Sequence, residues 1–190
     1  MRLNHRPSVF RETPIPGLIL INKPIFLDDR GFLEEFFKES EFKRLGHSFR
    51  GVHAALSVSK PGVIRGIHTE AWKKLIFPIS GYMFGAYPDT RKDSPTFGKV
   101  YTMEFDNRKL NSQRSALIIP PGVGNSICVI GNEPVFYIYL NEQEWEPSKA
   151  KGIAWNDPDL NIKWPVKNPV ISERDKNCPT LRQVYPDKFK

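Results

Sequence analysis

The chain is poor in the residues that build disulfide frameworks and metal clusters. It holds only two cysteines, Cys128 and Cys178, and only four histidines in 190 residues. Two cysteines without a CxxC spacing are too few for a disulfide scaffold, so we expect reduced thiols in a cytoplasmic protein.

Long apolar segments are also missing. Residues 1–14 contain no apolar stretch of the signal-peptide type, and the longest apolar runs, such as residues 18–21 and 116–119, are far too short to span a bilayer. We therefore expect no membrane partner and a flexible N-terminal segment over residues 1–14.

Basic residues are in excess, and the net charge is +7. Such a balance either serves solubility or indicates an anionic partner. The basic residues are spread along the chain and no nucleic-acid-binding signature is present, which favours a phosphorylated small molecule over nucleic acid.

Turn residues and aromatics predict a β-rich single domain over residues 1–190. The chain has 17 prolines and 13 phenylalanines, and it lacks long stretches rich in alanine and leucine. From residue 52 to 139, turn signals recur roughly every 8–15 residues, which is typical of an antiparallel sandwich or barrel.

The flanking regions predict a few further elements. Residues 17–26 are expected to be extended, and the aromatic residues 32–37 could form a strand buried on both sides. A short helix is expected over residues 39–45 with Ser40 as its N-cap, and the last forty residues read as an irregular arm with short helices.

One histidine stands out by its context. His68 ends the segment GVIRGIH at residues 62–68, a turn leading into a strand. Because alternate residues of a strand share a face, His68 and Arg65 lie on opposite faces unless the strand bends at Gly66. The residues alone leave a structural and a catalytic role for His68 open.

A metal site is not favoured around this histidine. His68 and Glu70 have the spacing of a ligand pair, but Asn125 stands where a second histidine ligand would be expected after the turn at residues 120–122. One His, one Glu and one Asn make a poor site for zinc, iron or copper, so we predict no metal. A metal-dependent oxygenase or isomerase remains the alternative.

Eight segments, in order, resemble the dTDP-4-dehydrorhamnose 3,5-epimerase family of nucleotide-sugar epimerases. The family-like region as a whole spans residues 15–182. The segments are DDRGFLEEF at 28–36, GVIRGIH at 62–68, KLI at 74–76, DTRKDSPTFG at 89–98, IPPG at 119–122, WNDP at 155–158, IKWP at 162–165 and ISERD at 171–175.

The resemblance implies an all-β fold, a cupin-like jelly-roll β-barrel with short peripheral helices and an irregular C-terminal arm. It implies a cofactor-independent isomerase that epimerises a nucleotide-linked 4-keto-6-deoxy sugar at C3, C5 or both, as in the biosynthesis of dTDP-rhamnose and polysaccharides. It also implies a homodimer whose N-terminal strands are exchanged.

The resemblance further assigns roles to individual residues. The catalytic set is a base at His68, its carboxylate partner Asp175, an acid at Tyr139 and an enolate-stabilising cation at Lys74. The substrate-binding set is Arg30, Glu35, Arg65, Asn125, Trp145 and Arg174.

Several positions depart from the family pattern and indicate a divergent branch. Asn125 stands where a histidine is usual, Trp145 replaces a tyrosine, and His53 replaces a glutamine. Thr69 and Glu70 follow the base where Tyr-Gln is typical. The sugar, the nucleotide and the number of epimerised carbons therefore stay open, and a non-catalytic nucleotide-sugar-binding protein is the alternative function.

Overall fold

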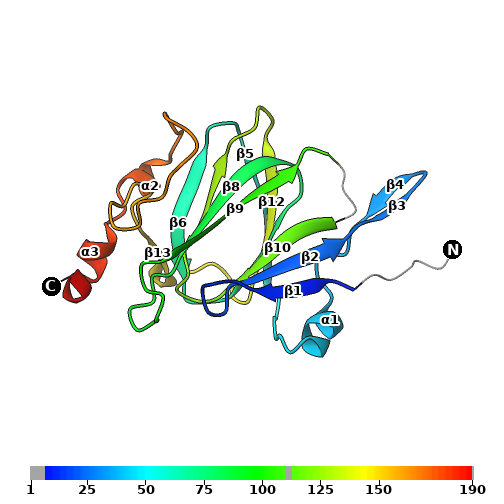
Figure 1. Ribbon diagram of the computed structural model, residues 1–190, viewed down its shortest axis with the longest axis horizontal. Coiled ribbons are helices and arrows are strands. Elements are labelled where there is room, and N and C mark those ends of the chain that lie inside the picture. Colours follow the sequence, from blue (N-terminus) through cyan, green and yellow to red (C-terminus); the bar gives the residue numbers. More distant parts are fainter. Residues whose placement is uncertain (1–6, 110–112, 190) are drawn as a thin grey trace.

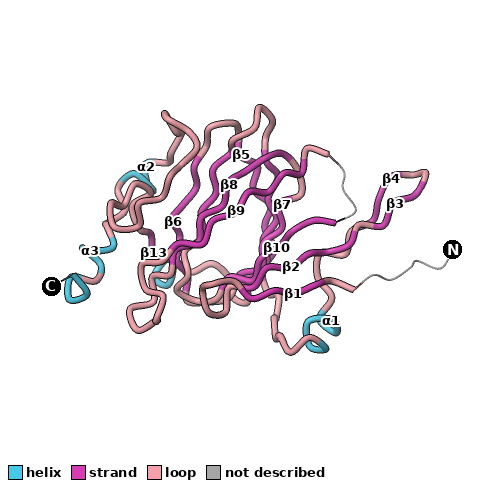
Figure 2. Tube along the Cα trace, viewed as in Figure 1, coloured by secondary structure: helices cyan, strands magenta, loops and turns pink. Residues whose placement is uncertain are grey.

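The protein, described by a computed structural model over residues 7–109 and 113–189, is built mostly from antiparallel strands. A six-stranded sheet has the order β1-β2-β10-β7-β12-β5, and a five-stranded sheet has the order β13-β6-β11-β8-β9. The two sheets face each other and form the predicted jelly-roll barrel (Figures 1 and 2).

The strands of the first sheet are β1 (Val9–Glu12), β2 (Ile19–Pro24), β5 (His53–Ser59), β7 (Lys74–Pro78), β10 (Gln113–Ile119) and β12 (Val135–Asn141). The second sheet contains β6 (Ile64–Glu70), β8 (Gly81–Pro88), β9 (Val100–Asn107), β11 (Asn125–Val129) and β13 (Ala150–Gly152). A separate hairpin joins β3 (Phe26–Asp28) to β4 (Gly31–Leu33). The helical elements are α1 (Glu39–Arg44), η1 (Pro147–Lys149), α2 (Glu173–Lys176), α3 (Leu181–Val184) and η2 (Pro186–Phe189).

Apolar side chains form a core on both faces of the six-stranded sheet. One cluster fills part of the space between the two sheets and includes Ile76, Met83 and Tyr87. A second cluster lies on the other face, where Phe42 of α1 packs with Phe77. As a result, every residue of β7 is buried. This strand lies between the two apolar clusters and contributes side chains to both.

The N-terminal segment contributes a strand to the six-stranded sheet. Residues 1–6 lie outside the described part of the chain, but Val9–Glu12 pair with β2 as strand β1. Phe10 packs edge-on against Phe42 and stacks on His47. Two aromatic contacts and a strand ladder hold β1 in the structure, and the flexibility expected over residues 1–14 stays a prediction.

The aromatic segment 32–37 is not a strand buried on both sides. Strand β4 ends at Leu33, and Phe32 and Leu33 are 49% and 55% exposed. Phe36 and Phe37 instead pack on the outer apolar cluster with α1. Helix α1 forms as predicted, but Lys38 occupies its N-cap without a side-chain hydrogen bond, so the prediction of Ser40 as the cap is wrong.

The C-terminal region lies at one end of the barrel, beside β6 and β13, as the expected irregular arm with short helices (Figure 1). A parallel bridge joins Val170 to Val63 beside β6. Ile67 packs with Ile153, Leu160 and Leu181 in a small core of its own. Among the described helices, none has the length and apolarity needed to cross a membrane.

Candidate active site

A cavity of about 320 Å³ opens between the two sheets. Charged, polar and aromatic side chains line it, which distinguishes it from the apolar core deeper in the barrel. The lining residues are His53, Ser57, Arg65, His68, Glu70, Lys74, Asn125, Ile127, Tyr137, Tyr139, Asn141, Trp145 and Arg174.

An irregularity in β6 brings His68 and Arg65 into this cavity together. Asn125 of β11 pairs with His68, and Ile127 pairs with Arg65, so the single residue between them in β11 lies opposite two residues of β6. The register shifts at Gly66, whose φ is +125°. A β-bulge of this kind changes which face the following side chains occupy, and it explains why residues three apart line one cavity.

His68 forms a close pair with a carboxylate from the C-terminal arm. Its Nε2 lies 2.8 Å from Oδ1 of Asp175, and Oδ2 of Asp175 accepts a hydrogen bond from the backbone N–H of Gly66 at 3.2 Å. Ser172 caps α2 by accepting from the N–H of Asp175, which fixes this residue in the first turn. The arm thus supplies the partner 107 residues along the chain.

The charge on Asp175 is maintained by its neighbours. Burial alone would raise the pKa of this carboxyl, but the hydrogen bonds from His68, Gly66 and Ser172 hold it below its ordinary value. A carboxylate that accepts from Nε2–H leaves the lone pair of a neutral imidazole on Nδ1. The pair can therefore take up a proton at His68 and stabilise the resulting imidazolium.

Lys74 brings a cation into the same cavity. Its Nζ lies 2.5 Å from Oε1 of Glu70 and 5.1 Å from the centre of the Tyr139 ring. Lys74 begins β7 and is only 5% exposed. A buried ammonium of this kind acts strongly on charge that develops beside it.

Two tyrosines of β12 face the cavity, and sequence reasoning singled out only one. Tyr139 lies under Lys74, as described, whereas the hydroxyl of Tyr137 donates to Oδ1 of Asn125 at 3.0 Å. Burial raises the pKa of the Tyr137 phenol well above its ordinary value, and the neighbouring Tyr87 adds to this. The alternation of residues 137, 139 and 141 along one strand is the signal that could have revealed Tyr137.

The predicted binding residues fall into two groups. Arg65, Asn125, Trp145 and Arg174 line the cavity, and the guanidinium of Arg65 is held by the hydroxyl of Ser59 at 2.7 Å. Arg30 and Glu35 do not line it. They lie on and after the β3–β4 hairpin, which projects from the barrel away from the C-terminal arm (Figure 1).

The departures from the family pattern lie in the cavity wall itself. Nδ1 of His53 lies 3.3 Å from the side-chain amide nitrogen of Asn141. Glu70 and Asn125, which would be two of the ligands in a metal site, are bound to Lys74 and Tyr137 instead. Over residues 7–109 and 113–189, no group of three or more His, Cys, Asp and Glu side chains could hold a metal ion.

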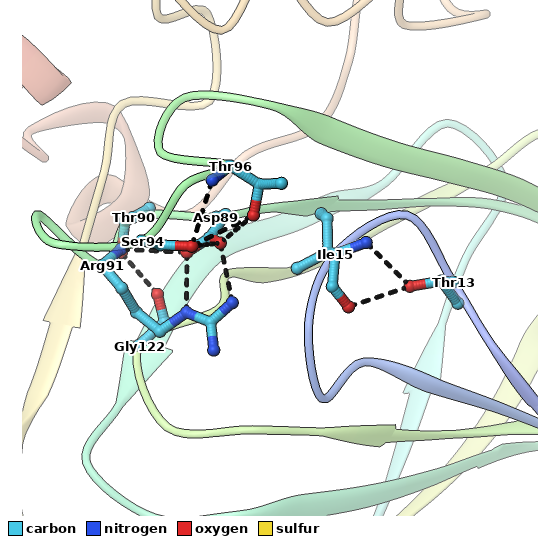
Figure 3. A network of polar contacts seen from close by, with 8 residues as sticks. All are labelled: Thr13, Ile15, Asp89, Thr90, Arg91, Ser94, Thr96 and Gly122. Atoms are coloured by element: carbon cyan, nitrogen blue, oxygen red, sulfur yellow. Dashed lines mark hydrogen bonds and ion pairs between the residues drawn. The ribbon is translucent and has the colours of Figure 1, made fainter.

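A buried carboxylate outside the cavity braces the turn that leads into β11 (Figure 3). Asp89 is fully buried and accepts hydrogen bonds from Arg91, Ser94 and Thr96. The hydroxyl of Thr90 donates to the carbonyl of Gly122 at 2.7 Å, and Gly122 precedes Asn125 by three residues. This network holds the turn that precedes Asn125, a residue of the cavity wall.

Comparisons with known proteins agree with this architecture. The model of the dTDP-4-dehydrorhamnose 3,5-epimerase family matches residues 12–183. The dTDP-4-dehydrorhamnose 3,5-epimerase of Shigella flexneri is 34% identical over 87% of this chain and 92% of its own length. The enzyme of the same name from Methanothermobacter thermautotrophicus is 33% identical over 92% and 95% of the two chains.

Solved structures are similar as well. NovW from Streptomyces spheroides, a 4-keto-6-deoxy sugar epimerase, has a TM-score of 0.86 at 27% identity, covering 97% of this chain and 95% of its own. ChmJ from Streptomyces bikiniensis, a 3′-monoepimerase in complex with dTDP-quinovose, has a TM-score of 0.84 at 27% identity and covers 93% and 89% of the two chains. The match along nearly the whole chain means that this protein belongs to the dTDP-4-dehydrorhamnose 3,5-epimerase family.

Proposed function

We propose that this protein epimerises a nucleotide-linked 4-keto-6-deoxy sugar by removing and returning a proton at C3, C5 or both. The observation that carries the proposal is the meeting of three groups in one cavity: the His68–Asp175 pair, the Lys74 ammonium and the phenols of β12. The relatives support the substrate class, since they are named as epimerases of dTDP-4-dehydrorhamnose or of 4-keto-6-deoxy sugars.

The first chemical step is assigned to His68. A ketone at C4 acidifies the hydrogens on C3 and C5, so a neutral imidazole can remove one of them. Asp175 orients the ring and stabilises the imidazolium that forms. Its buried position, 5% exposed for the side chain, keeps this interaction out of bulk water.

Removal of the proton places negative charge on the C4 oxygen. We assign the stabilisation of this enolate to Lys74, whose ammonium is buried in the cavity wall. A preorganised cation acts more strongly there than it would in water, because the cavity has a low dielectric constant. The whole step proceeds through the chain's own side chains and uses no redox cofactor.

Reprotonation from the opposite face needs an acid, and β12 offers two phenols. Tyr139 is the residue that the family resemblance implies. Tyr137 is the second candidate, favoured because its hydroxyl contacts Asn125, which pairs with His68 in the neighbouring strands. The raised pKa of Tyr137 keeps its proton in place until a carbanion takes it.

The nucleotide diphosphate is assigned to the basic rim of the cavity. Arg65 and Arg174 supply positive charge, and the exposed indole of Trp145, 53% accessible, offers a flat surface for a ring. Guanidinium groups match phosphate oxygens in geometry and charge.

Arg30 and Glu35 enter the proposal through a second copy of the chain. They lie outside the cavity of their own subunit, Arg30 on the projecting hairpin and Glu35 just after it. Leu27, Phe32 and Leu33 of this hairpin are about half exposed. We propose a homodimer in which this hairpin and the N-terminal strands reach the partner's site.

Both cysteines are free in the structure, in keeping with the cytoplasmic location that we also propose.

A non-catalytic nucleotide-sugar-binding protein is the competing function, and solvent exchange separates the two. Incubation with a panel of 4-keto nucleotide sugars in D₂O, followed by proton NMR, should show loss of the C3 or C5 signal. A protein that binds these compounds without any deuterium incorporation would contradict the enzyme proposal.

The same assay distinguishes the two phenols. Tyr137→Phe and Tyr139→Phe remove one hydroxyl each and keep the ring. The variant of the true acid should retain proton abstraction but lose epimerised product, by about 10²-fold or more. Equal, small losses in both variants would exclude a phenol of β12 as the acid.

A further inference from the structure

The cavity contains a carboxylate that the proposed mechanism does not use. Glu70 ends β6 two residues after the base, and its carboxylate lies 2.5 Å from the ammonium of Lys74. The two side chains are 9% and 6% exposed, so this ion pair is almost completely removed from solvent.

The surroundings of Lys74 leave it little freedom. A lysine ammonium carries three N–H donors. Glu70 takes one, and the ring of Tyr139 covers another side at 5.1 Å from its centre. The one N–H donor of Lys74 that remains can bind a single oxygen in the cavity.

The pair also changes how far the positive charge of Lys74 extends. An isolated cation attracts any anion over several ångströms, whereas a cation beside a carboxylate behaves as a dipole at longer range. At contact distance, however, the N–H group still binds an oxyanion strongly. The diphosphate therefore depends on Arg65 and Arg174, and Lys74 acts only on the atom that touches it.

We propose that Glu70 is a positioning residue that holds Lys74 for the enolate oxygen and limits its attraction for the rest of the anionic substrate. This inference rests on the proposed function. The charge of Glu70 also acts on Tyr137, where it is a minor cause of the raised pKa after burial and Tyr87. One carboxylate thus faces the cation and a phenol of the same cavity.

Two substitutions of Glu70 test separately whether it positions Lys74 and whether it offsets the positive charge of Lys74. Glu70→Gln keeps the size and an accepting oxygen but removes the charge, whereas Glu70→Ala removes both. For Glu70→Gln, we expect KM and the dissociation constant of dTDP to fall about three- to tenfold, since an uncompensated cation attracts the diphosphate. For Glu70→Ala, kcat for deuterium exchange should fall by roughly 10²-fold, because the oxyanion stabiliser is no longer held.

A double-mutant cycle shows whether Glu70 acts through Lys74. Each Glu70 variant is combined with Lys74→Met, and kcat, KM and dTDP binding are measured beside the thermal unfolding midpoint. In the Lys74→Met background both effects should shrink to less than about twofold, as expected for residues that act as a unit.

Three results would overturn the proposal. One is an equal loss of kcat on Glu70→Ala with and without Lys74, which would indicate a structural role. Another is unchanged kinetics and binding in both variants. The third is complete loss of exchange at one carbon in Glu70→Gln, which would make Glu70 itself a proton carrier. Absence of exchange in the wild-type protein would instead refute the proposed function, and the dTDP-binding cycle would still test the ion pair.

Discussion

The cavity and the β3–β4 hairpin both carry predicted functional residues, yet they are built in opposite ways. In the cavity and directly beside it, Lys74 and Asp175 are nearly buried, and each is bound to a partner within the same chain. On the hairpin, Phe32 and Leu33 are about half exposed, and the side chain of Arg30 is 89% exposed with Asp28 as its partner.

This difference suggests that chemistry and subunit contact are carried by different regions of the chain. Chemistry that depends on pKa and charge needs a low dielectric and fixed partners, which the barrel interior supplies. An exposed apolar hairpin gains most from burial against another surface. The hairpin is therefore the region that we expect to bind a second copy of the chain and to complete that copy's site.

The largest expected effect concerns the cavity, the first of the two regions compared. His68→Asn should lower the rate of deuterium exchange by about 10²–10⁴-fold or more, because it removes the general base. Binding of the nucleotide product should change little. Proton NMR in D₂O measures the rate.

His47→Asn is the matched control, since His47 stacks on Phe10 outside the cavity. Its exchange rate should stay near that of the wild type. Near-normal exchange in His68→Asn would refute the assignment of the base.

The next effect concerns the frame of the cavity and not its chemistry. Burial raises the pKa of Asp89, but hydrogen bonds from Arg91, Ser94 and Thr96 outweigh it and hold the pKa at about 2. Since the folded value lies below the unfolded one, this carboxylate stabilises the fold above pH 4 and loses that effect as the pH falls toward 2. Asp89→Asn should cost about 2 kcal/mol of unfolding free energy at pH 7.

Asp106 provides the control for this prediction. Its pKa is also held at about 2, chiefly by Arg108, but its side chain is 48% exposed. Solvent screens such a pair, so Asp106→Asn should change the stability far less. Urea unfolding of both variants between pH 3 and 7 makes the comparison, and equal losses would show that burial of Asp89 is irrelevant.

A smaller effect is expected on the hairpin side. Replacing Phe32 and Leu33 together by serine should weaken the dimer and raise KM about tenfold, because Arg30 and Glu35 would no longer be delivered to the partner's site. Sedimentation and steady-state kinetics at micromolar concentration measure both. Val52→Ser, another exposed apolar position at 48%, is the control. A clean wild-type monomer with full activity would end the proposal of a shared site.

The smallest expected effect is on specificity. By the family resemblance, Asn125 and Trp145 stand where a histidine and a tyrosine are usual, and Asn125 cannot ionise. With dTDP-4-keto-6-deoxyglucose, we expect C3-H and C5-H to exchange at rates that differ by about three- to tenfold, equivalent to roughly 1 kcal/mol. Asn125→His and Trp145→Tyr should reduce this difference. Equal loss of both NMR signals in the wild-type protein would show that the substitutions are silent.

The sequence was most informative where a pattern has a single physical reading. Turn residues predicted an antiparallel sandwich or barrel, and the ordered family segments implied the barrel. The same segments led to His68, Lys74 and Asp175, which lie in or beside one cavity. It was least informative where tertiary contacts decide. Phe32 and Phe37 look alike in sequence, yet one is half exposed and the other packs against Phe42.

Two cavity residues were missed for a related reason. From the sequence, Glu70 is considered only as a possible metal ligand and as a departure from the family pattern, and Tyr137 is not singled out. The alternation along β12 could place Tyr137 on the cavity face. No single-sequence pattern, however, reports the contacts at 2.5 Å and 3.0 Å that join Glu70 to Lys74 and Tyr137 to Asn125.

The bulge at Gly66 has a consequence for anyone who transplants this motif. An added Cβ at residue 66 would lie 2.5 Å from the Cβ of Ser126, so no larger residue fits without moving β11. On a regular strand, arginine and histidine spaced as Arg65 and His68 would point to opposite surfaces. The bulge at this glycine thus lets the two side chains face the same side of the strand. Grafting them onto another barrel would fail unless the glycine and its bulge were grafted as well.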